Sequence, residues 1–185
     1  MAGPRNSKAT GRDMVLSLAV LLVPVVLVVW FFTRTPDSPQ IDQVDWRPVL
    51  AQARSQAGYP VLAPTLEPSG WKPIKARYAD RGQTWVGDTV AAGNRWELGF
   101  LSADQTYIGL NQSDQPGRDA FIDAITRSAR ADGSVSIDGH QWQRRVSDDD
   151  RTRALVSSQG RSVVVVVGDT DYRVLEEYVQ MLRSS

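Results

Sequence analysis

The side chains that could do acid–base or metal chemistry in this sequence are few and stand far apart. His140, in the stretch "DGHQW", is the single histidine, and there is no cysteine. A metal site normally needs several His, Cys or carboxylate ligands, and a Ser–His pair needs a positioned nucleophile. The sequence offers His140 no such companion, so we expect it to have a structural or surface role.

Three consecutive acids, Asp148 to Asp150 in "SDDDRTR", are the other candidates for cation binding. Neighbouring residues of a strand point to opposite faces, so three acids in a row do not converge on one ion. The spaced acidic ligands and the glycine of a calcium loop are also missing from this stretch. We therefore expect a solvated hairpin loop, with Arg151 and Arg153 screening the acids.

Short motifs with a known chemical meaning give one match. Asn111-Gln112-Ser113 fits the acceptor pattern for N-glycosylation, which matters only in a eukaryotic secretory route, and we give it little weight. The sequence contains no nucleophile elbow, P-loop or dinucleotide-binding fingerprint. We therefore expect a protein that is not an enzyme and that holds no metal and no cofactor.

Charge and length narrow the class of protein. The 185 residues carry 21 basic and 21 acidic side chains, so there is no broad electrostatic signature for nucleic acid. Removing residues 1–32 leaves 153, which is enough for one domain with its own core.

Tryptophan is the one residue type that indicates a binding surface. Five of the six tryptophans lie beyond residue 32, and each brings a large apolar area with one hydrogen-bond donor. Packing in the core and at its rim is one reading, and a hydrophobic cleft or partner surface that uses one or two of them is the other. The candidates for contact with a ligand or partner are Trp71, Trp85, Trp96 and Trp142.

The segment that must hold this domain in place is the apolar stretch Met14 to Phe32. Its 19 residues carry no charge, and as a helix they would span roughly 28 Å, close to the hydrocarbon thickness of a bilayer. Pro24 lies mid-segment, where membrane helices tolerate a kink. Trp30, Phe31 and Phe32 gather at the distal end, as rings do at a membrane interface.

Three readings of this stretch remain open, and we favour a retained anchor. A secretory signal usually has an apolar centre of about 7–15 residues followed by a small-x-small cleavage site. Here the run is longer and ends in "WFFTRTP", which offers no such site. A cleaved signal and a buried soluble helix are the alternatives, although a soluble helix would normally show a polar stripe.

Basic residues near the stretch predict its orientation. Arg5, Lys8 and Arg12 precede it and Arg34 alone follows closely, which favours a cytoplasmic N-terminus at the plasma membrane. The expected organisation is a cytoplasmic tail at 1–13, a transmembrane helix at 14–32, a linker at 33–44 and an extracytoplasmic domain at 45–185.

Within that domain the hydrophobic periodicity predicts helices and strands in alternating groups. We expect a helix at 45–58 capped by Asp45, a second at 117–133 with an Asp123–Arg127 pair, and a last one capped by Thr170. Five consecutive valines in "RSVVVVVGDT" predict an interior strand covered on both faces. The other expected strands are 73–79, 84–91, 95–102, 105–112, 135–138, 140–146 and 152–158. The short connections favour a mainly antiparallel α+β domain with its helices packed on one face.

Five stretches carry a resemblance to a known family: "RDMVLSLAVLLVP", "PTLEPSGWKP", "ELGFLSADQTYIGLNQSD", "IDGHQWQRR" and "RSVVVVVGDTDYRVLEEYVQML". In these the sequence resembles domain of unknown function 4245, a family of actinobacterial single-pass membrane proteins. The resemblance implies an uncleaved N-terminal anchor and an extracytoplasmic domain. It implies no activity and no catalytic residues.

A looser similarity is to membrane-proximal domains of bacterial envelope-stress and sporulation regulators. These have an "LPeGW/Y" stretch and a strand that ends in a glutamine. Here "LEPSGW", Leu66 to Trp71, has the Glu and Pro exchanged, and Gln112 stands at the strand end. This similarity implies a sensing or docking module.

Our leading hypothesis is a non-catalytic, membrane-anchored extracytoplasmic domain that docks an envelope protein or a lipid-like ligand. The lipid bilayer is then a partner in itself. The alternative is an accessory subunit of a membrane complex that associates through its transmembrane helix. An enzyme whose site escapes sequence analysis is the third reading.

Overall fold

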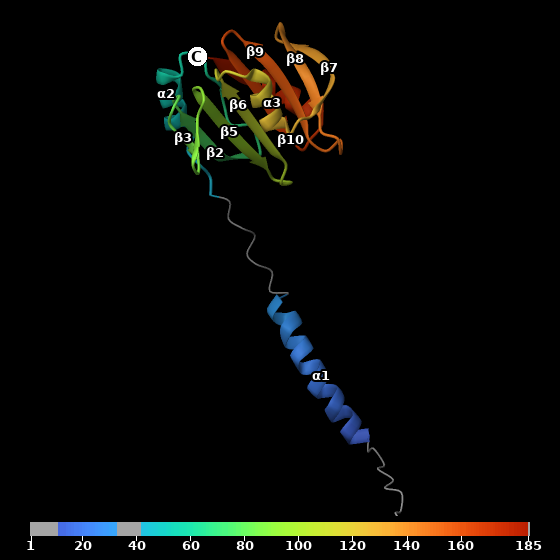
Figure 1. Ribbon diagram of the computed structural model, residues 1–185. Coiled ribbons are helices and arrows are strands. Elements are labelled where there is room, and N and C mark those ends of the chain that lie inside the picture. Colours follow the sequence, from blue (N-terminus) through green and yellow to red (C-terminus); the bar gives the residue numbers. More distant parts are fainter. Residues whose placement is uncertain (1–10, 33–41, 185) are drawn as a thin grey trace, which may run out of the picture. The chain divides into compact units, whose positions relative to one another are not determined.

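The computed structural model describes residues 11–32 and 42–184, in two compact units that divide between Ile41 and Asp42 (Figure 1). Most of the expected tail, 1–13, and of the expected linker, 33–44, lies outside the described residues. The backbone N–H of Val44 donates to the carbonyl oxygen of Pro73 at 2.9 Å, within the second unit.

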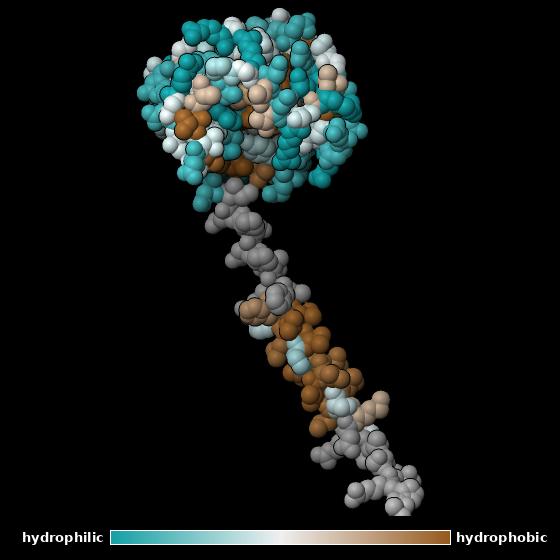
Figure 2. All heavy atoms as spheres, in the orientation of Figure 1, coloured by the Kyte–Doolittle hydropathy of each residue, from teal (hydrophilic) through white to brown (hydrophobic). Residues whose placement is uncertain are grey.

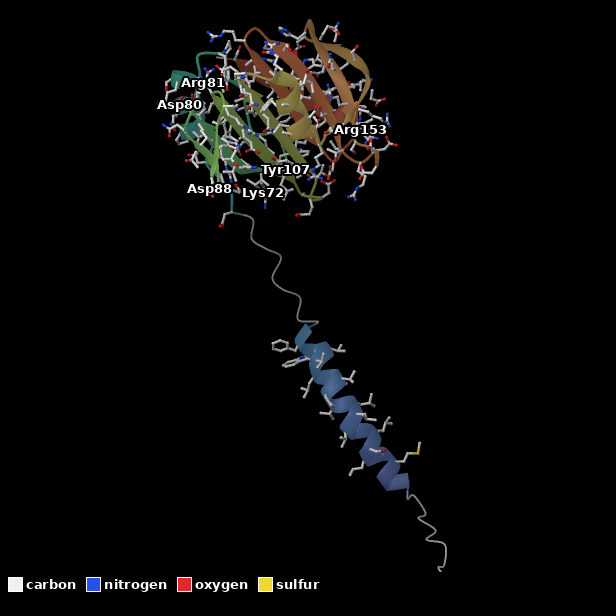
Figure 3. The ribbon with its side chains drawn as sticks, viewed as in Figure 1. Lys72, Asp80, Arg81, Asp88, Tyr107 and Arg153 are labelled. Atoms are coloured by element: carbon white, nitrogen blue, oxygen red, sulfur yellow. The ribbon has the colours of Figure 1, made fainter. Side chains whose placement is uncertain are left out.

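The first unit contains one helix, α1, Gly11–Phe32. Its segment Met14–Phe31 has a mean hydropathy of 2.9 and none of it is buried, which makes it long and apolar enough to cross a membrane. Pro24 lies inside the helix without ending it, and the Ser17 hydroxyl donates to the Met14 carbonyl at 3.0 Å. Figure 2 shows the hydrophobic colour along this helix, and Figure 3 shows its side chains projecting on several sides.

The second unit is built on a seven-stranded sheet in which every neighbouring pair is antiparallel. This confirms the α+β class and the antiparallel pairing. The strand order across the sheet is β2-β5-β6-β10-β9-β8-β7, so the valine-rich strand lies in the middle. The strands are β2 Trp71–Ala79, β5 Arg95–Ser102, β6 Tyr107–Ser113, β7 Arg130–Ile137, β8 His140–Val146, β9 Arg153–Gln159 and β10 Ser162–Gly168.

Helices cover both faces of this sheet, so the expectation of helices on one face is wrong. Helices α2, Arg47–Gln56, and α4, Tyr172–Gln180, pack with Val164 and Val166 of β10 in the larger core. Helix α3, Arg118–Thr126, packs with Val163 and Val165 on the opposite face, in front of the sheet in Figure 1. The physical reason is that alternate valines of one strand point to opposite sides, and each side needs an apolar cover.

Helix α2 forms within the expected range 45–58, but it starts at Arg47 with Trp46 at the N-cap position, so the expected cap by Asp45 is wrong. Asp45 Oδ1 accepts a hydrogen bond from the backbone N–H of Arg47 at 3.2 Å, and Gly58 follows the helix at a φ of +67°. Leu50 and Ala53 form its buried stripe. The Asp45 carboxylate therefore contacts the first turn from one residue before the cap, while Gly58, which accepts a left-handed backbone, follows the end of the helix as predicted.

Three expected elements are corrected. The single strand at 84–91 is a separate two-stranded hairpin, β3 Thr84–Val86 and β4 Thr89–Val90, because the chain turns at Gly87 with a φ of +55°. Helix α3 ends at Thr126 instead of continuing toward 133, since the next residue adopts a left-handed conformation. The last helix has Asp171 at its N-cap position in place of Thr170.

A small second sheet closes the larger core. Strand β1, Leu62–Pro64, pairs antiparallel with β11, Leu182–Ser184, which follows α4. Strand β1 lies in residues 59–73, called here the proline-rich segment because four of them are prolines. Its first part, up to Pro64, is extended and packed, and residues near both ends of the domain meet there.

Candidate functional site

His140 stands at the start of β8, after a tight turn that contains Gly139 at a φ of +78°. Its side chain is exposed and has no hydrogen-bond or ion-pair partner among residues 42–184. In the described parts of the chain no three potential metal ligands lie together. The arrangement around His140 therefore provides neither a general base held by an orienting partner nor a metal centre.

A cavity of about 310 Å³ lies beside His140, and the two sides of this cavity differ in character. Its apolar wall comes from β1, β7, β8, α4 and β11, and its polar rim includes His140, Asp138 and Arg183. Ligand pockets commonly combine an apolar lining with a few polar groups at the edge. The apolar lining consists of Leu62, Ile137, Trp142, Val179 and Leu182.

The four tryptophans predicted for contact do not form one patch. Trp96 is fully buried, and its indole Nε1–H donates to the Leu62 carbonyl at 2.9 Å, so it holds β1 against the sheet. Trp142 is 2 % exposed and reaches the His140 cavity. Trp71 is half-buried against the larger core, and Trp85 lies in the β3–β4 hairpin.

Trp85 is covered by an arginine of the main sheet. The Arg95 guanidinium carbon lies 4.3 Å from the centroid of the Trp85 ring and 5.3 Å from that of Phe121 on α3. Burial lowers the pKa of Arg95, and its Nε has no hydrogen-bond partner among the described residues. Arg95 therefore joins the hairpin to α3 through two aromatic faces.

The acids at 148–150 form a loop between β8 and β9, as the sequence predicts. Asp149 Oδ1 accepts hydrogen bonds from the Ser147 hydroxyl at 2.5 Å and from the backbone N–H of Arg151 at 3.2 Å. These bonds hold the pKa of Asp149 below its usual range. Asp150 pairs with Arg130 of β7 at 2.7 Å, so the neighbouring acids are engaged separately.

The glycosylation-like triplet lies inside the sheet. Asn111 is 3 % exposed and Ser113 is 2 % exposed, both on β6. A glycan on Asn111 would have no room in the folded domain. The burial of Asn111 and Ser113 therefore agrees with the expectation that this triplet is a chance match.

Gln112 of the same triplet organises a buried polar network. Its Oε1 accepts from the backbone N–H of Leu62 at 2.9 Å, and its Nε2 donates to the Pro60 carbonyl at 2.8 Å and to Ser162 Oγ at 3.0 Å. Tyr59 donates its hydroxyl to the Gln112 carbonyl at 3.3 Å, and burial raises the Tyr59 pKa. The network anchors the proline-rich segment to the sheet.

A second cavity, of about 500 Å³, lies between α2 and the β1–β11 pair, and sequence reasoning did not find it. Trp46, Arg47 and Arg54 reach it from the α2 region, and Arg183 reaches it from β11. The only advance signal was the seven-residue spacing of Arg47 and Arg54, which puts both on one side of a helix. Nothing in the sequence relates Arg183 to them.

Comparison with known proteins gives one family match. The family described as "Protein of unknown function (DUF4245)" matches residues 7–182, which is nearly the whole chain. No curated protein matches the chain. The actinobacterial origin and the looser similarity to envelope-stress and sporulation regulators stay predictions. On its match over residues 7–182, the chain belongs to the DUF4245 family of proteins of unknown function.

Proposed function

We propose that this protein is a single-pass membrane protein of the plasma membrane, with a cytoplasmic N-terminus and a non-catalytic extracytoplasmic domain that docks a partner. The observation that carries the proposal is the apolar helix Met14–Phe31, none of which is buried. A soluble core helix of this length would bury most of its side chains.

The energetic argument favours insertion in a bilayer. Thirteen of the residues from Met14 to Phe31 are Leu, Val or Phe. On an insertion scale each contributes about −0.3 to −0.6 kcal/mol, so together they favour the bilayer by roughly 4–8 kcal/mol. Because both units belong to one chain, insertion of the helix would attach the domain covalently to the membrane.

Docking is supported by the character of the cavities. Both combine apolar walls with polar side chains at the rim, as binding pockets do. On the rim of the His140 cavity the imidazole lacks the oriented partner that acid–base catalysis requires, and the other charged groups there, Asp138 and Arg183, pair with each other at 3.8 Å. Binding is therefore the chemistry that this geometry suits.

Membrane insertion and orientation can be tested with single cysteines, because the chain has none. Asp148→Cys places a thiol in an exposed loop of the domain, and Ser7→Cys places one in the N-terminal tail. We expect the chain to stay in membranes after alkaline carbonate washing, with a mass that includes residues 1–32. An impermeant maleimide should label Asp148→Cys in intact cells and leave Ser7→Cys unlabelled. Release by carbonate, or the reverse labelling, contradicts the proposal.

Docking at the His140 cavity can be tested by site-specific photo-crosslinking in cells. A photoreactive amino acid at His140 lies on the rim of the cavity, and the same group at Asp88 lies in the exposed β3–β4 turn as a matched control. We expect a discrete protein or lipid adduct from position 140 and none from position 88. Equal adducts at both positions, or none at either, would count against docking there.

A further inference from the structure

The cavity between α2 and the β1–β11 pair, called here the arginine cavity, combines positive charge with an apolar floor. Its volume of about 500 Å³ falls within the range of small-molecule sites, roughly 300–1,000 Å³. Its lining consists of Trp46, Arg47, Leu50, Ala51, Arg54, Ala63, Pro64, Thr65 and Arg183.

The lining holds three arginines and no acid. The Arg54 guanidinium has no hydrogen-bond or ion-pair partner among the described residues. Arg47 pairs with Glu67 at 3.2 Å and with Asp45 at 3.8 Å. Arg183 pairs with Asp138 at 3.8 Å and donates to the carbonyls of Gln180 at 2.8 Å and Leu182 at 2.6 Å. Each arginine keeps donors beyond those contacts, because a guanidinium carries five N–H groups.

This positive charge is local. Residues 42–185 carry 17 basic and 19 acidic side chains, so the domain as a whole is slightly negative. Of the three guanidiniums around the cavity, Arg54 is the one without an acidic partner among the described residues, so its charge attracts an anion to that place. Guanidinium groups suit phosphate and carboxylate oxygens, which they bind through two parallel hydrogen bonds.

The floor of the cavity is apolar. Leu50, Ala63 and Pro64 belong to it, and Leu66, which follows Thr65 in the sequence, is 77 % exposed. Trp46 also lines the cavity, and its indole Nε1–H has no hydrogen-bond partner among the described residues. A ligand with an anionic head and an alkyl part would match both sides of the cavity.

We infer that the arginine cavity binds an anionic phospholipid, with its phosphate between Arg54 and Arg183 and its apolar part on the floor. This deepens the proposed docking role and rests on it, because the bilayer that α1 spans would supply the ligand. Covalent attachment to that bilayer raises the effective concentration of a weak ligand. Inorganic phosphate has no apolar part, so it would make no hydrophobic contact with the floor of the cavity or with Leu66.

The test uses the full chain in nanodiscs that contain either phosphatidylcholine alone or phosphatidylcholine with phosphatidylglycerol. Hydrogen–deuterium exchange is measured in peptides that cover α2 and β11. We expect slower exchange of both segments in the anionic discs, and less of this protection at 0.5 M salt than at 0.1 M, since salt screens exposed charges. Adding inorganic phosphate to the neutral discs should leave exchange unchanged.

Arg54→Gln and Arg183→Gln should each remove most of the protection, since losing one charged hydrogen bond weakens binding about tenfold. Arg151→Gln removes the same charge from an exposed loop away from the cavity, and this variant should keep the protection from exchange. Both cavity side chains are exposed, so far-ultraviolet circular dichroism should show an unchanged fold.

The outcomes separate this inference from the proposed function. If the chain does not assemble with the discs, membrane anchoring fails. If it assembles and α2 exchanges equally in both kinds of disc, the phospholipid site is refuted while the anchor stands. Equal protection by inorganic phosphate would make the cavity a general anion site. If lipid composition has no effect and the chain instead forms an Arg54-dependent complex with an acidic protein, the ligand of the cavity is that protein and the phospholipid inference is refuted.

Discussion

The side-chain amide of Gln112 on β6 donates a hydrogen bond of 3.0 Å to the hydroxyl of Ser162 on the neighbouring β10, and neither residue is exposed to solvent. Ser162 in turn donates to the Gln159 carbonyl at 3.2 Å. The pair connects the two halves of the sheet at β6–β10, and the remaining bonds of Gln112 reach the segment before β1.

Replacing Gln112 by Leu should therefore lower the stability of the domain. The substitution keeps the volume approximately but leaves the buried N–H of Leu62 and the Pro60 carbonyl without partners, at a cost of about 1–3 kcal/mol. Urea unfolding measures this loss. Gln143→Leu, at an exposed position of β8, is the matched control and should change stability by less than about 0.5 kcal/mol. Equal effects of the two changes would show that the network does not stabilise the fold.

Arg95 and Trp85 should be energetically coupled. Their stacked arrangement predicts a coupling of about 0.5–2 kcal/mol in a double-mutant cycle of Arg95→Gln and Trp85→Leu. The free energy of unfolding of the four proteins provides the measurement. Additive effects would mean that the hairpin is held by other contacts, and would leave Trp85 open as a partner-contact residue.

Gly99 is predicted to be intolerant of a side chain because of Tyr107, which Figure 3 labels on the domain. A Cβ at Gly99 would lie 2.6 Å from the Tyr107 hydroxyl oxygen and 2.8 Å from a ring carbon. Gly99→Ala should cost about 1–3 kcal/mol as the ring is displaced. In the background of Tyr107→Ala the same change should cost far less, and an undiminished cost in that background would locate the strain elsewhere.

Alkaline pH should destabilise the domain through its tyrosines. Burial raises the pKa of Tyr107 to about 12, and the unfolded value is about 10. Because the folded state holds the proton more tightly, this stabilisation is complete below about pH 10 and is lost as pH rises toward 12. Absorbance at 295 nm and circular dichroism, recorded together, should show phenol ionisation accompanying unfolding. Tyr107→Phe should move the unfolding midpoint to higher pH, and an unchanged midpoint would contradict the assignment.

Exchanging residues 14–32 for an unrelated apolar span separates docking from the accessory-subunit alternative. If the domain carries the binding, the exchanged protein should remain in the membrane and keep both its photo-crosslinks and its lipid-dependent protection. Loss of association with an intact, membrane-retained domain would indicate that the helix itself makes the contact. Native electrophoresis of detergent extracts, from cells that produce either the native or the exchanged protein, provides the comparison.

Local sequence predicted the features that depend on short-range physics. The uncharged run from Met14 to Phe32 has one stable form as a helix, because its backbone groups must be satisfied within the segment when lipid surrounds it. Alternating periodicity located most strands, and Gly58 located the end of α2. The isolation of His140 was also visible, since a sequence with one histidine and no cysteine restricts ligand sets directly.

Tertiary structure alone decided which distant residues meet. The run of five valines predicts that both faces of its strand are buried, but only the tertiary structure shows that α3 packs on the second face. Arg54 and Arg183 are 129 positions apart, and they share a cavity because β11 pairs with β1 beside α2. Gln112 could have been an exposed strand end, yet it is buried beneath the proline-rich segment. Periodicity reports one element's apolar faces, whereas the contacts between elements arise only when the whole chain buries those faces together.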